Sequence, residues 1–496
     1  AIDFVSIQYV YDGFGNQIGV IDPNGNRTVF EYNANNQLVE EENEVGHHIE
    51  YVYDAIGNRV GEKQDRCLMD VGLCNSDGNT ITYDYDEAGR RIRIRYADDT
   101  ESIFTYNARG DLTNMIDRQS ADGLNNTHTV SYTYDKLGRK LTETDAYGNS
   151  ISYTYDALGN VLTVTDKESR VTTYIYDEFN RLISEEDNGG NITRYTYDAQ
   201  GNQTGITYAD NTTVDYIYDT GHRKTDTIDA YNNTSTLVYD GHGNITSRID
   251  KKGNSTSFVY NKLDQLTSET NVQGTQTIYT YDNNGNRLSE NVDGHVTSFL
   301  YDDLNRVTQV TSLGNKTEHY TYDAEGNIIT KVDGENSTIT YVYDVLGQIV
   351  SKTFSDETQS TYIYDNWGDN TQSVTLELTT NYTYDDLNRQ TQEVQRFSDL
   401  PENSKIITRT YNTDSSPASL TDASGKTITY TYNNRGFLQT VNYLGQPLAT
   451  YGYTSFGKPA SLTYANNYTT NYVYDDLQRL ETQTIVNPQA ETVWSH

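Results

Sequence analysis

The sequence predicts an all-β fold in which tandem β-hairpin repeats form one continuous spiralling or solenoid-like antiparallel sheet. The motif Tyr-x-Tyr-Asp, or a near variant of it, occurs 22 times, and most successive copies are 21 residues apart. Tyr (45 copies) and Gly (36 copies) are abundant, whereas Pro occurs only 6 times, a composition typical of strands and tight turns. Self-similarity at such a period indicates a repeat protein, in which each unit buries its apolar face only against its neighbours.

The first strand of a unit is clearest at residues 151–155. Ile151, Tyr153 and Tyr155 alternate with Ser152 and Thr154, the period-two pattern of a strand with one face packed. A tyrosine suits this face because its ring fills a layer while its hydroxyl reaches water or a polar partner at the rim.

A turn and a second strand complete the unit. Asp156 begins the turn, where its carboxylate can accept hydrogen bonds from backbone N–H groups two residues on, while Gly159 and Asn160 tolerate a positive φ. The second strand is expected at residues 161–165, and residues 166–169 turn the chain into the next unit. Each repeat is therefore a β-hairpin that adds to the edge of the previous one.

These positions recur at fixed offsets, and we assign them structural roles. The expected layer-forming tyrosines are Tyr134, Tyr155, Tyr176, Tyr197 and Tyr218, and the expected turn residues are Asp135, Asp156, Asp177, Asp198 and Gly159. The first Tyr of the motif is replaced at Phe30, Phe104, Leu237, Phe258 and Phe299. That position therefore tolerates loss of the hydroxyl, which indicates packing rather than chemistry.

The whole chain, residues 1–496, reads as a single array of about 22 hairpin units and is expected to be a segment of a longer protein. The spacing lengthens in three places, which predicts inserted loops near residues 61–80, 114–128 and 391–405. Insertions in a repeat array map to loops, where function is often added, although surface loops also drift neutrally in length.

Cys67 and Cys74 are the only cysteines, and both lie in the first insertion. A disulfide that closes this short loop would fit an oxidising compartment, and two free thiols are the alternative. A structural zinc site needs four ligands, and no second Cys or His pair is near in sequence.

The formal net charge of −35 argues against a nucleic-acid partner, because binding phosphates requires clustered Lys and Arg. The acidic residues are spread over all repeats, which suits a soluble, self-repelling surface in salty or extracellular surroundings. No apolar stretch approaches the roughly 18 residues of a membrane span.

No catalytic constellation is apparent. The sequence contains no zinc-protease motif, nucleophile elbow or phosphate loop, so we expect no enzyme activity and no cofactor. A sugar-cleaving β-solenoid would need a converging carboxylate pair, and none can be named. The recurrent Asp could be imagined as a calcium ligand, but its turn role explains it without a metal, and Asn replaces it at Asn33, Asn107, Asn261, Asn412 and Asn433.

Two runs carry a family resemblance. Residues 153–163 read Tyr-Thr-Tyr-Asp-Ala-Leu-Gly-Asn-Val-Leu-Thr, and residues 174–184 read Tyr-Ile-Tyr-Asp-Glu-Phe-Asn-Arg-Leu-Ile-Ser. They resemble the YD repeat of the RHS family. In that family such repeats form a long spiralling sheet: bacterial toxins and insecticidal toxin-complex components use it as a shell around a toxic polypeptide, and teneurins use a similar shell in cell-surface adhesion.

The resemblance implies a non-enzymatic shell wall of a large secreted bacterial protein, which encloses or presents a polypeptide toxin cargo. Its partners would be that cargo or further YD repeats of the same protein, and a cell-surface receptor is a further candidate. The alternative is an extracellular fibre or adhesin stalk for cell-cell contact. The Pro-x-x-x-x-Asp-Pro-x-Gly-Leu motif with which RHS toxins close their core is missing here, so self-cleavage is not carried over to any residue.

Overall fold

The computed structural model describes residues 6–68, 73–120, 128–475 and 478–495. Its described part contains strands and turns and no helix. The first 22 strands are β1 (Gln8–Tyr11), β2 (Gln17–Ile21), β3 (Arg27–Tyr32), β4 (Leu38–Glu42), β5 (His48–Tyr53), β6 (Arg59–Leu68), β7 (Leu73–Tyr85), β8 (Arg91–Arg95), β9 (Thr100–Tyr106), β10 (Leu112–Ser120), β11 (Thr129–Tyr134), β12 (Lys140–Thr144), β13 (Ser150–Tyr155), β14 (Val161–Thr165), β15 (Val171–Tyr176), β16 (Leu182–Glu186), β17 (Ile192–Tyr197), β18 (Gln203–Thr207), β19 (Thr213–Tyr218), β20 (Lys224–Ile228), β21 (Thr234–Tyr239) and β22 (Ile245–Ile249).

The remaining strands continue in the same way. They are β23 (Ser255–Tyr260), β24 (Leu266–Thr270), β25 (Gln276–Tyr281), β26 (Arg287–Val292), β27 (His295–Tyr301), β28 (Val307–Ser312), β29 (Lys316–Tyr322), β30 (Ile328–Val332), β31 (Thr338–Tyr343), β32 (Ile349–Phe354), β33 (Gln359–Tyr364), β34 (Asn370–Val374), β35 (Leu378–Tyr384), β36 (Gln390–Phe397), β37 (Leu400–Tyr411), β38 (Pro417–Thr421), β39 (Thr427–Tyr432), β40 (Leu438–Tyr443), β41 (Gln446–Tyr453), β42 (Pro459–Tyr464), β43 (Thr469–Tyr474), β44 (Leu480–Val486) and β45 (Thr492–Ser495).

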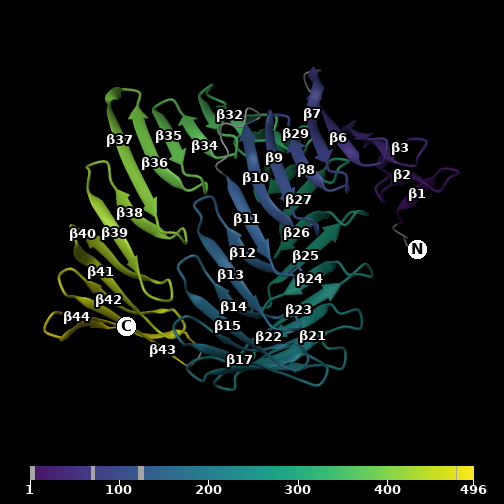
Figure 1. Cartoon of the computed structure of the whole chain (residues 1–496). Coiled ribbons are helices and arrows are strands. Elements are labelled where there is room, and N and C mark those ends of the chain that lie inside the picture. Colours follow the sequence, from purple (N-terminus) through teal and green to yellow (C-terminus); the bar gives the residue numbers. More distant parts are fainter. Residues whose placement is uncertain (1–5, 69–72, 121–127, 476–477, 496) are drawn as a thin grey trace. The chain divides into compact units, whose positions relative to one another are not determined.

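Neighbouring strands pair in chain order and antiparallel, as the run from β11 to β17 shows (Figure 1). Within the hairpin β13–β14, Tyr153 lies opposite Val164 and Thr154 opposite Thr163, and the register shifts between Thr154 and Tyr155. The same shift recurs before the second Tyr of the following hairpins. The predicted all-β fold of tandem hairpins in a solenoid-like antiparallel sheet is confirmed.

The chain divides into two compact units. One comprises Ala1–Thr129, Ser257–Asn381 and Arg396–Pro401, and the other comprises Val130–Thr256, Tyr382–Gln395 and Glu402–His496. In both units the packing is that of a single sheet layer, because most strand residues are half-buried. Tyr83, at 8% exposure, is the most buried apolar side chain among the described residues.

The repeats that the structure describes have two kinds of turn. We call the turn that follows Tyr-x-Tyr-Asp the tip turn, as at residues 156–160, and the turn that leads into the next repeat the link turn, as at residues 166–170. The two turns lie at opposite ends of the strands, because β13 runs toward the tip turn and β14 runs back to the link turn. The sheet thus has a tip edge and a link edge.

The three predicted insertions coincide with lengthened strands. β6 and β7 lengthen one hairpin over residues 61–68 and 73–80, and β36 and β37 lengthen another over residues 391–397 and 400–405. β10 runs into the insertion near residues 114–128 as far as Ser120. That the whole chain is one YD-repeat domain stays a prediction.

Candidate functional site: turn edges and the seam between them

The tip-turn aspartate organises its own turn. Asp156 Oδ1 accepts hydrogen bonds from the backbone N–H groups of Leu158 (2.9 Å) and Asn160 (2.9 Å), and its Oδ2 accepts one from Asn160 Nδ2 (2.8 Å). These bonds, the side-chain bond from Asn160 first, hold the pKa of Asp156 below its usual 3.8 against the opposing effect of burial. Gly159 has φ of 99°, a conformation that L side chains rarely adopt.

The other predicted turn aspartates have the same geometry. Their Oδ1 atoms accept the backbone N–H groups two and four residues on, at distances of 2.8–3.0 Å, as seen for Asp135, Asp177 and Asp198. The carboxylates are therefore directed at their own turns. No group of three or more His, Cys, Asp or Glu residues in the described part of the chain is placed to hold a metal ion.

The second Tyr of the motif connects one repeat to the next. Tyr155 donates its hydroxyl to the backbone carbonyl of Lys140 at 2.6 Å, Tyr197 to Leu182 at 2.8 Å and Tyr218 to Gln203 at 2.8 Å. In each case the acceptor is at the start of the second strand of the preceding hairpin. Each hydroxyl therefore holds two successive hairpins together.

Tyr134 and Tyr176 occupy the equivalent positions at the ends of β11 and β15, and both are half-buried. Burial first, and then the nearby charge of Asp156, raises the pKa of the Tyr176 hydroxyl above its usual value of 10.

The first Tyr packs on the face of the hairpin and often lies opposite a carboxylate. Tyr174 lies across from Glu185 in the β15–β16 pair. Burial and the charge of Glu185 raise the pKa of Tyr174. Burial and the charge of Glu143 likewise raise the pKa of Tyr132.

An arginine at the end of many tip turns forms a second connection between repeats. Arg181 Nε donates to Asp177 Oδ2 of its own turn at 2.7 Å, and Arg181 Nη1 donates to the carbonyl of Asp198 in the next tip turn at 3.0 Å. Its guanidinium also lies over the ring of Tyr197, 4.7 Å from the centroid. The same three contacts are made by Arg90, Arg139, Arg223, Arg306 and Arg389.

Cys67 and Cys74 are directly opposite one another in the backbone register of β6 and β7. Directly opposed residues of an antiparallel pair have Cα atoms about 4.5–5.5 Å apart, within the range that a disulfide bridges. Their side chains lie outside the described part of the structure, so the disulfide stays a prediction.

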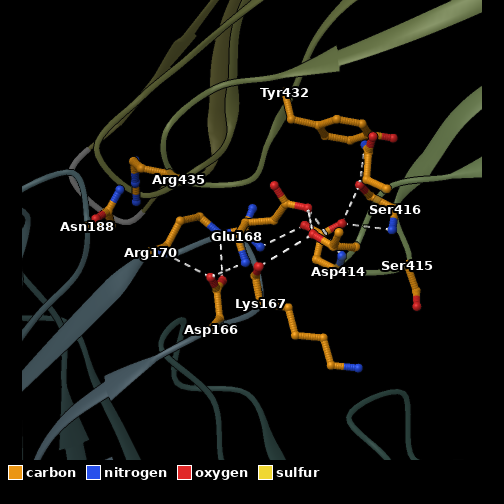
Figure 2. A network of polar contacts seen from close by, with 12 residues as sticks. Asp166, Lys167, Glu168, Arg170, Asn188, Asp414, Ser415, Ser416, Tyr432 and Arg435 are labelled. Atoms are coloured by element: carbon orange, nitrogen blue, oxygen red, sulfur yellow. Dashed lines mark hydrogen bonds and ion pairs between the residues drawn. The ribbon is translucent and has the colours of Figure 1, made fainter. Parts of the chain in front are cut away.

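Tip turns also contact link turns that are far away in the sequence, and we call this contact the seam. In the second unit the link turn 166–170 meets the tip turn 412–416 (Figure 2). Arg170 Nη2 donates to Asp414 Oδ2 at 2.7 Å, Glu168 Oε1 accepts the Asp414 N–H at 3.3 Å, and Thr413 donates its hydroxyl to Glu168.

The next repeat along continues the seam with the charges reversed. Arg435 of the tip turn donates from Nε to Asp187 Oδ2 of the link turn at 2.8 Å, and Asn188 Nδ2 donates to the carbonyl of Asn434 at 2.6 Å. Both arginines lie close to a glycine. A Cβ on Gly436 would lie 2.4 Å from Arg170 Nη1, and one on Gly189 would lie 2.6 Å from Arg435 Cδ.

Further contacts extend the second unit's seam in both directions. The Tyr147 hydroxyl accepts the Asp386 N–H at 3.1 Å, the Tyr208 and Phe456 rings are 5.3 Å apart, and Gln478 Nε2 donates to Asp210 Oδ2 at 3.1 Å. The hydrogen-bonded partners are 239 to 268 residues apart in the sequence.

The first unit has a seam of its own. Asn284 of a tip turn donates from Nδ2 to Asp22 Oδ2 of a link turn at 2.6 Å, 262 residues away in the sequence. Trp367, at a tip turn, donates from Nε1 to the carbonyl of Asp117 at 3.0 Å and stacks on His128 at 3.9 Å between ring centroids.

Two seam aspartates, Asp414 and Asp187, have lowered pKa values. Burial opposes ionisation of Asp414, but hydrogen bonds from Ser416 and the Arg170 pair outweigh it, so the pKa lies below 3.8. Asp187 behaves in the same way, with hydrogen bonds from Asn191 and the charge of Arg435 outweighing burial.

The described part of the chain contains no helix that is long and apolar enough to cross a membrane. The contacts of the tip edge and the link edge define one class of protein. It is a tandem YD-hairpin array whose turns hold successive repeats together and also connect distant ones.

Comparison with known families supports this class. The teneurin YD-shell family model matches residues 5–156, 74–223 and 213–393. Because these matches cover most of the chain, the chain belongs to the YD-shell family. The comparison with curated proteins gives no match.

Solved structures with the same fold are Tc toxin components. A TcdB2-TccC3 structure matches 99% of this chain with a TM-score of 0.60 and 13% identity, and a Photorhabdus luminescens Tc holotoxin pore matches 97% with a TM-score of 0.58 and 14% identity. TcdB2-TccC3 without its hypervariable C-terminal region matches 97% with a TM-score of 0.57 and 14% identity. The chain spans about a third of the length of these proteins, 33%, 30% and 30% respectively.

Proposed function

We propose that the chain is a non-enzymatic wall segment of a YD shell, which encloses or presents a polypeptide cargo. The observation that carries the proposal is the seam. In each unit an earlier segment, mostly through its link turns, is bonded to the tip turns of a segment roughly 240–270 residues later. A sheet whose hairpins only stacked into a straight fibre would keep such segments far apart.

The chemistry of the seam suits a wall. Its contacts are hydrogen bonds and ion pairs between turns. The earlier and the later segment of the one-layer sheet therefore join edge to edge, and neither segment covers a face of the other. The resemblance of the fold to the Tc toxin structures supports secretion, a bacterial source and a toxin-like polypeptide as the cargo, and all three are parts of the proposal.

Electron microscopy of the isolated chain distinguishes the wall from an adhesin stalk. We expect curved particles in which two passes of sheet lie side by side. A straight rod on the order of 200 Å long, the length of 45 strands stacked in one direction, would reject the wall and favour a fibre that contacts a cell-surface receptor.

A further inference from the structure

The chain contains three Asn-Gly dipeptides, which begin at Asn24, Asn188 and Asn284. This dipeptide is especially prone to spontaneous deamidation, because glycine has no side chain to keep its backbone nitrogen away from the carboxamide of the preceding asparagine. The three asparagines belong to three turns that are far apart in the sequence. All three nevertheless donate their side-chain amide across the seam.

In the first unit two of these asparagines form a reciprocal pair. Asn24 of a link turn donates from Nδ2 to Asp282 Oδ2 at 3.0 Å. Asn284 of a tip turn donates from Nδ2 to Asp22 Oδ2 at 2.6 Å. The backbone N–H of Asn24 also donates to Asn284 Oδ1 at 3.1 Å. Each carboxylate therefore faces a neutral amide donor of the opposite turn.

These amide donors help to keep both carboxylates charged. Burial opposes ionisation of Asp22, but hydrogen bonds, led by that from Asn284, outweigh it and lower the pKa. For Asp282, hydrogen bonds from Asn286 and then from Asn24 outweigh burial, and the pKa is lowered as well. Conversion of Asn24 or Asn284 to aspartate would replace a donor by a second carboxylate at hydrogen-bonding distance, and like charges at that distance repel one another.

In the second unit Asn188 connects a link turn to a tip turn. Its Nδ2 donates to the carbonyl of Asn434 at 2.6 Å, and its Oδ1 accepts the Val171 N–H at 3.2 Å. Deamidation would set a carboxylate oxygen against the Asn434 carbonyl oxygen. Neither atom can donate, so this contact would be lost.

Deamidation needs no reactant other than water. The backbone nitrogen of the glycine loses its proton and attacks the side-chain carbonyl carbon of the asparagine. The new C–N bond closes a succinimide ring, and the amide nitrogen leaves as ammonia. Water then opens the ring at either carbonyl and gives aspartate or isoaspartate. Each site thus exchanges a neutral carboxamide for a carboxylate.

The closed turns restrain this reaction. In each dipeptide the glycine N–H donates to the aspartate that begins the same turn. The acceptors are the Asp22 carbonyl for Gly25 (3.0 Å), the Asp282 carbonyl for Gly285 (3.2 Å) and Asp187 Oδ1 for Gly189 (2.8 Å). Attack requires the glycine nitrogen to give up this bond and the asparagine side chain to leave its partner across the seam. Local opening must therefore precede deamidation.

We propose that Asn24, Asn188 and Asn284 are deamidation sites that the seam controls. A closed seam protects them, an open seam allows them to react, and the carboxylates formed keep the seam from closing again. A reversible opening is thereby made permanent. This modification depends on the contacts of the seam and not on what the wall encloses.

Peptide mass spectrometry of the full chain, incubated at mildly alkaline pH with and without urea, tests the protection. We expect deamidation at the three sites to be slower by about tenfold or more in the native chain than in urea, since only the open fraction reacts. A synthetic peptide of residues 20–29 controls for the effect of urea itself and should react at the same rate in both solutions. Equal rates in the native and the unfolded chain would overturn the proposal.

Aspartate substitutions that mimic the product test the effect on the seam. Asn24→Asp and Asn284→Asp should each speed hydrogen–deuterium exchange by about tenfold in the turns of residues 22–26 and 282–286. The matched control is Asn283→Asp, which adds the same charge at an exposed position of the same tip turn and leaves the Asn284 amide in place. Unchanged exchange in the hairpin β13–β14 shows that the variants fold.

The outcome at the two turns decides the proposal. Faster exchange in both turns for the two seam variants, with the control like the parent chain, supports it. Parent-like exchange in Asn24→Asp and Asn284→Asp, or an equal rise in Asn283→Asp, would contradict it.

Discussion

At the scale of single residues, the two tyrosines of each motif have different tasks. The first packs on the sheet face, and five copies replace it with Phe or Leu. The second is Tyr in all 22 copies, and at Tyr155, Tyr197 and Tyr218 its hydroxyl donates to a carbonyl of the preceding hairpin. The ring role of these residues could be predicted from alternation, but the acceptor could not, because it belongs to another repeat and depends on the register of the sheet.

This difference predicts unequal effects of hydroxyl removal. Tyr155→Phe should lower the free energy of unfolding by about 1 kcal/mol, because the Lys140 carbonyl loses its donor. Tyr153→Phe is the matched control and should change it by a few tenths of a kcal/mol at most, since that position tolerates Phe in other repeats. Urea denaturation of both variants measures this, and equal losses would contradict the assignment.

The tyrosines whose pKa is raised should titrate late. Burial, and in many cases a nearby carboxylate, raises the pKa of residues such as Tyr174 and Tyr195 above 10. A pKa raised in the folded state gives stability that is present below the unfolded value and is lost as the pH rises through the folded value. Absorbance titration of phenolate should therefore show a fraction of the tyrosines ionising at higher pH in the native chain than in urea, where the midpoint is near 10. Coincident curves would disprove it.

At the scale of the hairpin, the tip turn with its arginine connects one repeat to the next. Arg181 makes an ion pair in its own turn, donates to the next turn and covers the next tyrosine. A lysine cannot make these contacts together because it lacks the planar guanidinium. Arg181→Lys should cost about 1 kcal/mol of stability, whereas Arg194→Lys, at an exposed strand position, should cost almost nothing. Thermal melts of the two variants compare them directly.

The turn aspartates predict sensitivity to acid. Their pKa values are lowered in the folded state, as for Asp156 through Asn160 and for Asp229, whose pKa falls to about 2 because hydrogen bonds, led by that from Lys251, outweigh burial. A lowered folded pKa gives stability that is present above the unfolded value and is lost as the pH falls through the folded one. Melting temperature should therefore drop between about pH 4 and about pH 2.

A matched substitution refines the acid prediction. Asn stands at the same turn position at Asn261 and makes the corresponding backbone bonds. Asp156→Asn should keep the turn and reduce the acid-induced loss, and a variant with an unchanged pH profile would show that this turn does not contribute.

The hairpin and the tip turn could be predicted from the sequence, because both depend on residues that are close together in the chain. The period of 21 residues gives the strands, and Asp, Gly and Asn at fixed offsets give the tip turn. The arginine contacts were missed, although a signal was present: Arg recurs four residues after the motif Asp at Arg139, Arg181 and Arg223.

At the scale of the whole molecule, the seam distinguishes a wall from a fibre. Its residues come from turns roughly 250 residues apart, and nothing in a single repeat marks them. Arg170 and Asp414 look like ordinary turn residues, and only the path of the sheet brings them to 2.7 Å. Sequence alone therefore left the wall and the fibre open, and the seam is the feature that favours the wall.

The distance across the seam tests this central claim most directly. Spin labels at Val171 and Thr410, in a background with both native cysteines replaced, would lie next to the Arg170–Asp414 pair while leaving it intact. Both positions are exposed. Double electron–electron resonance should give a distance within about 25 Å, since each label is only a few residues from the ion pair. A straight sheet would separate β15 from β37 by on the order of 100 Å, and a distance of that size would contradict the account.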